Sequence, residues 1–66
     1  MVAQEKSKVT RKPIGKLGFP EGAIIGCVIR GETVTIPVGT TQIAPDDRVV
    51  VLSLPRSIRD VEQLFS

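Results

Sequence analysis

Two extended segments joined by a glycine-led dipeptide constrain the fold of this chain more than any other feature of its sequence. Residues 23–30 are apolar at nearly every position, and so on both faces of an extended chain, which is typical of a central strand. After Gly31-Glu32, residues 33–36 alternate polar and apolar side chains, as a strand with one solvated face does. Because Gly adopts a positive φ without a steric penalty, this two-residue connection predicts a type II′ turn. We therefore expect strands 23–30 and 33–36 to form an antiparallel hairpin.

Strict alternation along the first strand divides its side chains between two faces. One face is expected to carry Ala23, Ile25, Cys27 and Ile29, and the other Ile24, Gly26, Val28 and Arg30. Pro37 lacks an amide donor, so it should end the second strand.

A second apolar run predicts another strand at residues 49–54. The preceding segment, Ala44-Pro45-Asp46-Asp47, has the composition of a turn. The run itself is continuously apolar apart from Ser53 and has no helix-forming bias, so we expect a strand that is buried on both faces.

The hydrophobic period changes after Leu54, which indicates a C-terminal helix. Four apolar residues then recur at helical spacing: Ile58, Val61, Leu64 and Phe65. With Pro55 in its first turn, the helix should run for about ten residues. Ser57 and Asp60 fit a capping box, and Arg56 and Asp60 are placed for an i,i+4 ion pair.

Upstream of Phe19 the pattern is weaker. Residues 13–17 are expected to form one helical turn with Ile14 and Leu17 inward, and residues 2–5 a short strand. Together the elements predict an α+β fold, a small, mostly antiparallel β-sheet or partial barrel of about four strands capped by a C-terminal helix. A chain of 66 residues accommodates one domain, residues 1–66.

The composition argues against catalytic and metal chemistry. The chain contains no His and one Cys, so neither a nucleophile with an imidazole base nor an ordinary zinc ligand set is present. We therefore predict that the protein is not an enzyme and holds no metal, and we interpret Cys27 as a packing residue.

Basic residues are concentrated in the N-terminal arm. Residues 1–16 contain five Lys or Arg against one Glu, net +4, whereas residues 17–66 contain four Arg against six acids, net −2. The arm has no aromatic side chains on which bases could stack, so a solvated segment is the favoured interpretation and no nucleic-acid partner is expected. The alternative is a small β-barrel that binds nucleic acid through Lys8, Arg11 and Lys12.

An ordered set of short matches identifies a family resemblance. The set comprises Phe19-Pro20-Glu21-Gly22-Ala23-Ile24-Ile25-Gly26, Ile29-Arg30-Gly31, Ile36-Pro37, Asp47-Arg48-Val49-Val50-Val51, and Leu54-Pro55 with Ile58, Val61, Leu64 and Phe65. In this order they resemble the C-terminal domain of TrkA-type potassium-uptake regulators, the C-terminal lobe of the RCK family. One departure lies at the turn, where the family usually has Gly-Asp-Arg and this chain has Asp46 in place of the Gly. If the backbone there requires a positive φ, Asp46 costs about 1 kcal/mol relative to Gly.

The resemblance implies a non-catalytic regulatory and ligand-sensing domain that controls potassium transport through a membrane-embedded transporter subunit. It implies homodimers, a cytoplasmic location at the inner face of the membrane, and cyclic di-AMP or a divalent cation as the effector between paired lobes. In the family a separate N-terminal Rossmann-like lobe binds NAD or ATP; this chain has no G-x-G-x-x-G, and no such cofactor is expected in it. Met1-Val2 begins inside what the family treats as its first strand, so we expect a fragment of a longer protein.

Arg30 is the one charged residue within the apolar strand. Two interpretations stay open: an exposed strand end paired with a nearby acid, which is favoured, or a side chain facing the ligand cleft between two lobes.

Overall fold

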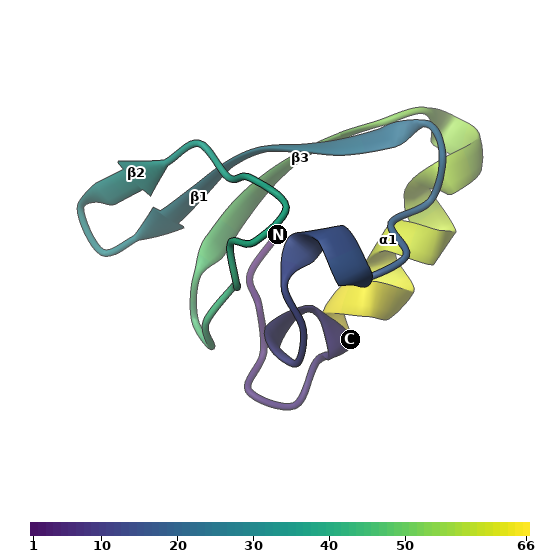
Figure 1. The fold of residues 1–66 in the computed structure, drawn as a ribbon. Helices are drawn as coiled ribbons and strands as arrows, with labels where there is room; N and C mark the ends of the chain where they lie inside the picture. Colours follow the sequence, from purple (N-terminus) through teal and green to yellow (C-terminus); the bar gives the residue numbers. More distant parts are fainter.

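A computed structural model describes residues 1–66 as one three-stranded antiparallel sheet with short helices packed against one of its faces (Figure 1). The strands are β1 (Ala23–Arg30), β2 (Thr33–Thr35) and β3 (Arg48–Ser53), and their order in the sheet is β2-β1-β3. The 3₁₀ turns are η1 (Lys8–Thr10), η2 (Ile14–Lys16) and η3 (Pro55–Ser57), and the last continues into the helix α1 (Ile58–Phe65). This arrangement confirms the predicted α+β fold class. No helix has the length and apolar character needed to cross a membrane.

The hairpin and the central position of β1 are confirmed. Arg30 pairs with Thr33, so Gly31 and Glu32 form the connection. Gly31 has a φ of 59°, and Glu32 is not among the residues with positive φ, which is the combination that a type II′ turn requires. β2 ends at Thr35, before Pro37.

The predicted division of β1 between two faces is wrong beyond Ile25, because a β-bulge interrupts the alternation. Ile25 pairs with Val51 but Cys27 pairs with Val50, so Gly26 is an extra residue in β1. The bulge reverses which side chains point inward: Ile25 and Val28 are buried in the core. Ile24 is exposed, and Cys27 and Ile29 are half-buried on the opposite, outer face.

The prediction that residues 49–54 are buried on both faces is also wrong for the single chain. Val49 is buried, whereas Val50 and Leu52 are exposed. Helices cover only the inner face of the sheet, so every second side chain of β3 meets solvent. β2 likewise projects past the core, and Val34 on its outer face is exposed.

The core lies between the inner face of the sheet and the helical segments. Its buried residues come from the N-terminal segment, β1, the loop before β3, β3 and α1: Ala3, Val9, Ile25, Val28, Ile43, Val49, Val61 and Phe65. Ile14 and Leu17 are half-buried and pack against it, as predicted for the turn that contains η2. The predicted strand at residues 2–5 is reduced to one antiparallel bridge between Val2 and Arg48.

The C-terminal helical segment is confirmed, but its start is stabilised differently from the prediction. Ser57 makes no side-chain capping bond; its Oγ donates a hydrogen bond of 2.6 Å to the carbonyl oxygen of Glu21. The predicted ion pair between Arg56 and Asp60 is not formed. The one salt bridge in the chain joins Arg30 to Asp47. Ser57 therefore ties the helix start to the loop that leads into β1.

Candidate functional site

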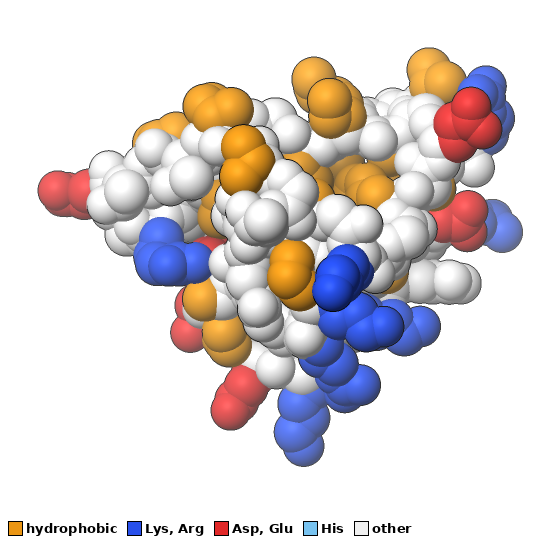
Figure 2. All heavy atoms as spheres, in the orientation of Figure 1, with side chains coloured by type: hydrophobic (Ala, Val, Ile, Leu, Met, Phe, Trp, Pro, Cys, Tyr) orange, Lys and Arg blue, Asp and Glu red, His pale blue; other side chains and the backbone are white.

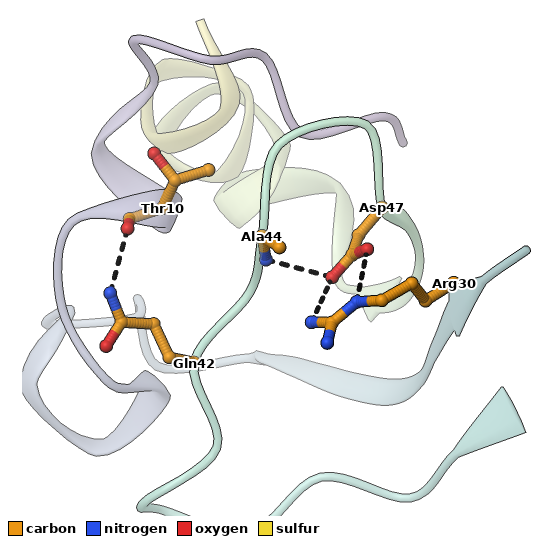
Figure 3. A network of polar contacts seen from close by, with 5 residues as sticks. All are labelled: Thr10, Arg30, Gln42, Ala44 and Asp47. Carbon is orange, nitrogen blue, oxygen red and sulfur yellow. Dashed lines mark hydrogen bonds and ion pairs between the residues drawn. The ribbon is translucent and has the colours of Figure 1, made fainter. Parts of the chain in front are cut away.

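Arg30 and Asp47 form a bidentate ion pair at the end of β1 (Figure 3). Nε and Nη2 of Arg30 donate hydrogen bonds of 2.9 Å to Oδ1 and Oδ2 of Asp47. The Arg30 side chain is 62% exposed, whereas that of Asp47 is 2% exposed. The structure thus places Arg30 as the favoured interpretation predicted, at an exposed strand end paired with an acid.

The turn at residues 44–47 presents the Asp47 carboxylate to Arg30. The backbone N–H of Ala44 donates a bond of 2.9 Å to Oδ2 of Asp47, so the side chain closes the turn. Asp46 has a φ of 71°, the left-handed conformation that the family's usual Gly would adopt without strain. Ala3 holds the turn from outside, accepting from the Asp46 N–H at 2.7 Å and donating to the Asp47 carbonyl at 2.8 Å.

The pair shifts both ionisations in the direction that stabilises the charged forms. Hydrogen bonding to Arg30 lowers the pKa of Asp47; burial of the carboxyl opposes this, and the Ala44 N–H adds to it. The hydrogen bond to Asp47 and then its charge raise the pKa of Arg30. Asp47 is therefore an ionised, buried anchor, while Arg30 keeps one terminal nitrogen, Nη1, without a partner in the chain.

A polar hollow lies next to Arg30 on the inner side of the hairpin. We call it the threonine hollow; its volume is about 330 Å³, and its lining residues are Val28, Arg30, Thr33, Thr35, Thr41 and Gln42. Register explains the lining, because Thr35 and Thr33 lie opposite Val28 and Arg30. Gln42 is fixed by its own hydrogen bond of 3.0 Å from Nε2 to the Thr10 carbonyl (Figure 3). Three hydroxyls, one amide and one guanidinium can hydrogen-bond a polar ligand here.

The opposite face of the sheet is apolar. The outer apolar face consists of Ile24, Cys27 and Ile29 of β1, Val34 of β2, and Val50 and Leu52 of β3. Ile24 and Leu52 are cross-strand partners and are 62% and 63% exposed. Figure 2 shows apolar side chains standing out along the upper edge of the view, over the sheet. Cys27 belongs to this face rather than to the core, and it is a free, half-buried thiol.

A third region gathers cations of the N-terminal arm. Four of the five, Lys8, Arg11, Lys12 and Lys16, line one hollow together with Leu17 and Leu64. In Figure 2 most of the Lys and Arg side chains in view gather over this part of the molecule. The sequence analysis named Lys8, Arg11 and Lys12 together, but nothing in it indicated that Leu64 of α1, from the other end of the chain, would lie beside them.

The sequence pointed to Arg30 but missed the other polar residues around it. Thr41 and Gln42 lie in a loop whose path depends on two backbone bonds of 2.8 Å, from the Ile14 N–H to the Thr41 carbonyl and from the Gly15 N–H to the Gly39 carbonyl. No local pattern encodes that contact. The alternation of Thr33 and Thr35 was the one available sign of a polar inner side.

Comparisons with known proteins agree on one family and one fold. A family model described as the TrkA-C domain matches residues 1–66. Over 63 residues the chain is 41% identical to the Trk system potassium uptake protein TrkA homolog 1 of Methanosarcina mazei, covering 96% of this chain and 14% of that protein. It is 40% identical over 63 residues to the Trk system potassium uptake protein TrkA of Vibrio alginolyticus, covering 94% and 14%. A solved structure described as "Structure of RCK domain with cda" is similar with a TM-score of 0.79 at 21% identity, over 100% of this chain and 96% of that one. The chain thus spans about one seventh of the length of these curated relatives and nearly the whole of that solved chain.

Proposed function

The chain belongs to the TrkA-C domain family, and we propose that it is the regulatory, ligand-sensing and dimerisation domain of a Trk-type potassium-uptake system. The role is regulatory rather than catalytic. The domain would act from the cytoplasmic side on a membrane-embedded transporter subunit, together with a Rossmann-like lobe that binds NAD or ATP. The outer apolar face is the observation that carries this proposal, because it gives the domain a surface for pairing.

The outer apolar face supports pairing with a second copy of this chain. Fully burying a Leu or Ile contributes about 1.5 to 3 kcal/mol, so Ile24 and Leu52, each more than half exposed, would contribute about 1 to 2 kcal/mol apiece. A two-fold interface sets the same patch of both copies face to face, so like charges on it would repel. None of the six residues of the face is charged, and Arg48, opposite Ile29, lies at its end.

The outer edge of β3 is paired with the N-terminal residues as far as Val49, and beyond Val49 it extends this surface. An apolar groove of about 450 Å³ runs between β3 and the start of α1, and its lining includes Val50, Val51 and Ile58. Val50 also belongs to the outer apolar face, so the groove and the face are continuous. Small domains seldom bury enough apolar surface to be very stable alone, and this one has neither a disulfide nor a cluster of metal-ligating residues.

The threonine hollow supports ligand sensing. Arg30 offers the unpartnered Nη1, and the hollow supplies hydroxyl groups from Thr33 and Thr35. Cyclic di-AMP and divalent cations are the effectors that the family resemblance implies. The similar solved structure is described as an RCK domain with cda. An effector regulates only if it binds one arrangement of the paired domains more tightly than another, so its binding and dimerisation should be coupled.

Sedimentation equilibrium of the 66-residue chain and two variants tests the pairing. Leu52→Asp places a carboxylate on the outer apolar face next to Ile24, at one of its most exposed positions, and it should convert the dimer to a monomer at micromolar concentration. Val38→Asp is the matched control, because Val38 is 64% exposed and lies off the sheet, in the loop next to η2. A wild-type monomer, or equal dissociation of both variants, would contradict the proposed interface.

Thermal unfolding with cyclic di-AMP, nucleotides and divalent cations tests the ligand. A ligand at 100 times its Kd stabilises the folded state by about 2.7 kcal/mol, which a melting curve detects easily. Arg30→Gln should reduce the shift, and Arg56→Gln in η3 should not. For the transport role, potassium uptake should lose its response to the effector in cells whose protein carries Leu52→Asp in this domain, while Val38→Asp retains it.

A further inference from the structure

We propose that the hollow on the N-terminal side of the molecule is a binding site for a multiply charged, phosphate-bearing group. This basic hollow is lined by Lys8, Arg11, Lys12, Lys16, Leu17 and Leu64 and has a volume of about 280 Å³. It is distinct from the outer apolar face and from the threonine hollow, with which it shares no residue. The proposal therefore does not depend on the proposed pairing or effector.

The cations of the basic hollow are uncompensated within the chain. The one salt bridge in the molecule joins Arg30 to Asp47, so none of the four cations is paired with a carboxylate. The lining contains no acidic residue. Arg11 makes a single side-chain hydrogen bond, a long one of 3.4 Å to the Lys6 carbonyl. Four like charges around one hollow repel one another, and a bound anion would remove that repulsion.

The backbone beneath these cations is held in place. Between Lys8 and Arg11, Val9 is fully buried in the core. Ser7, which precedes η1, is 1% exposed; its Oγ donates to the Gln4 carbonyl at 2.8 Å, and its own carbonyl accepts from the Thr10 hydroxyl at 2.9 Å. The positions from which the cations project are therefore set before an anion binds, which lowers the ordering cost of binding.

A second set of contacts fixes the Lys16 side of the hollow. The Leu17 N–H bonds to the Ile14 carbonyl at 3.2 Å, and η2 is tied to the 39–41 loop by the bonds from Ile14 and Gly15. Leu64 reaches the hollow from α1 and is half-buried, so the floor of the site joins both ends of the chain. Two leucines beside four cations suit a ligand with an apolar portion next to its charge.

Phosphate is the anion that this set of groups fits best. A phosphate group presents several acceptor oxygens and more than one charge, which a guanidinium can bind with two parallel bonds and ammonium groups with single ones. The lining has no aromatic side chain for base stacking, and the hollow is small for a nucleic-acid strand. The phosphate could belong to a soluble metabolite or to the headgroup of an anionic lipid.

The test is a titration of the 66-residue chain with inorganic pyrophosphate at about 0.15 M salt, in which binding is monitored through the NMR chemical shifts of the backbone amides. Saturable shifts confined to residues 7–17 and 63–66 are expected. Lys12→Gln should weaken binding by about tenfold, and Lys12→Arg should restore it. Lys6→Gln is the matched control, because it removes the same charge from the same arm at a position outside the hollow; it should change the Kd by less than about twofold.

The sources of the phosphate are separated by a second arm. Sedimentation with vesicles of phosphatidylcholine alone, or with added phosphatidylglycerol, reports a lipid headgroup. Binding to the anionic vesicles that is lost in Lys12→Gln and kept in Lys6→Gln assigns the lipid source, and pyrophosphate binding without vesicle binding assigns a soluble one. Either result supports the site. The proposal would be overturned if Lys6→Gln and Lys12→Gln weakened binding equally, or if the pyrophosphate titration did not saturate. It would also be overturned if the protein bound a DNA duplex, added in the same way, but neither pyrophosphate nor the vesicles.

Discussion

Replacing Asp47 by Asn tests whether the buried carboxylate at the end of β1 stabilises the fold. The carboxylate accepts three hydrogen bonds, all of 2.9 Å, two from Arg30 and one from the Ala44 N–H. The Asn amide keeps the shape and one acceptor oxygen, but its NH₂ group would face a donor. At least one charge-assisted bond, worth about 1.5 to 3 kcal/mol, is lost at a position that is 1% exposed.

The net loss for Asp47→Asn is expected to be about 2 kcal/mol. Because the Arg30 side chain is largely exposed, its guanidinium is rehydrated when the pair is broken, so the full penalty of an isolated buried charge does not apply. In a domain of this size, about 2 kcal/mol corresponds to a decrease in Tm of roughly 8 to 16 °C. Urea titrations followed by circular dichroism measure the effect, since the chain has no Trp or Tyr for fluorescence.

The lowered pKa of Asp47 predicts that the stability difference between the wild type and Asp47→Asn depends on pH. The pKa of Asp47 is lowered in the folded state, so the stability that the carboxylate contributes is present above its unfolded pKa of about 4 and is lost as the pH falls through the folded pKa. The difference in unfolding free energy between the wild type and Asp47→Asn should therefore be constant near neutrality and shrink below about pH 4. An Asn variant as stable as the wild type at neutral pH would refute the reasoning, and so would a difference that grows on acidification.

Three further substitutions are expected to change the unfolding free energy, measured by the same urea titrations. Gly15→Ala should destabilise the folded state by about 1 to 3 kcal/mol, because its Cβ would lie 3.0 Å from the Gly39 carbonyl oxygen. Gly39→Ala is the control and should be tolerated, because its Cβ would come no closer than 3.9 Å to another residue. Ser57→Ala should cost about 1 to 2 kcal/mol, because it leaves the Glu21 carbonyl without its 2.6 Å bond, and no loss would contradict that role. Asp46→Gly should stabilise by about 0.5 kcal/mol, since relief of the positive φ exceeds the added flexibility of the unfolded chain, and a loss of stability would show that the turn is unstrained.

Local features of the sequence were predicted correctly because short-range physics decides them. Gly31 fixes the hairpin through its own φ, and the helical spacing after Pro55 fixes the last element. The strain at Asp46 was foreseen as conditional on a positive φ, which the structure contains. An acidic partner for Arg30 was predicted, but not which acid it would be. That the partner is Asp47 depends on the pairing of β1 with β3.

The candidate sites were harder to predict because they depend on contacts between distant segments. The threonine hollow requires the 39–42 loop to return to η2, and the basic hollow requires Leu64 of α1 to reach the N-terminal arm. The faces of β1 were misassigned because one extra residue, Gly26, shifts every later side chain by one position. A Gly inside a strand is a recognised sign of a bulge, so this signal was present in the sequence.

The error about β3 bears on the proposed pairing of two domains. A continuous apolar run is the pattern of a strand covered on both faces, yet the single chain covers only the face that carries Val49. Solvent exposure alone would favour polar residues at Val50 and Leu52, as in antiparallel sheets with one wet face. The Gly26 bulge places Cys27 and Ile29 on the same side of the sheet as Val50 and Leu52. The bulge in β1 therefore enlarges the apolar surface to which the exposed residues of β3 contribute. If two copies pair through this face as proposed, the prediction that β3 is buried on both faces holds for the pair, because the second copy covers the outer face.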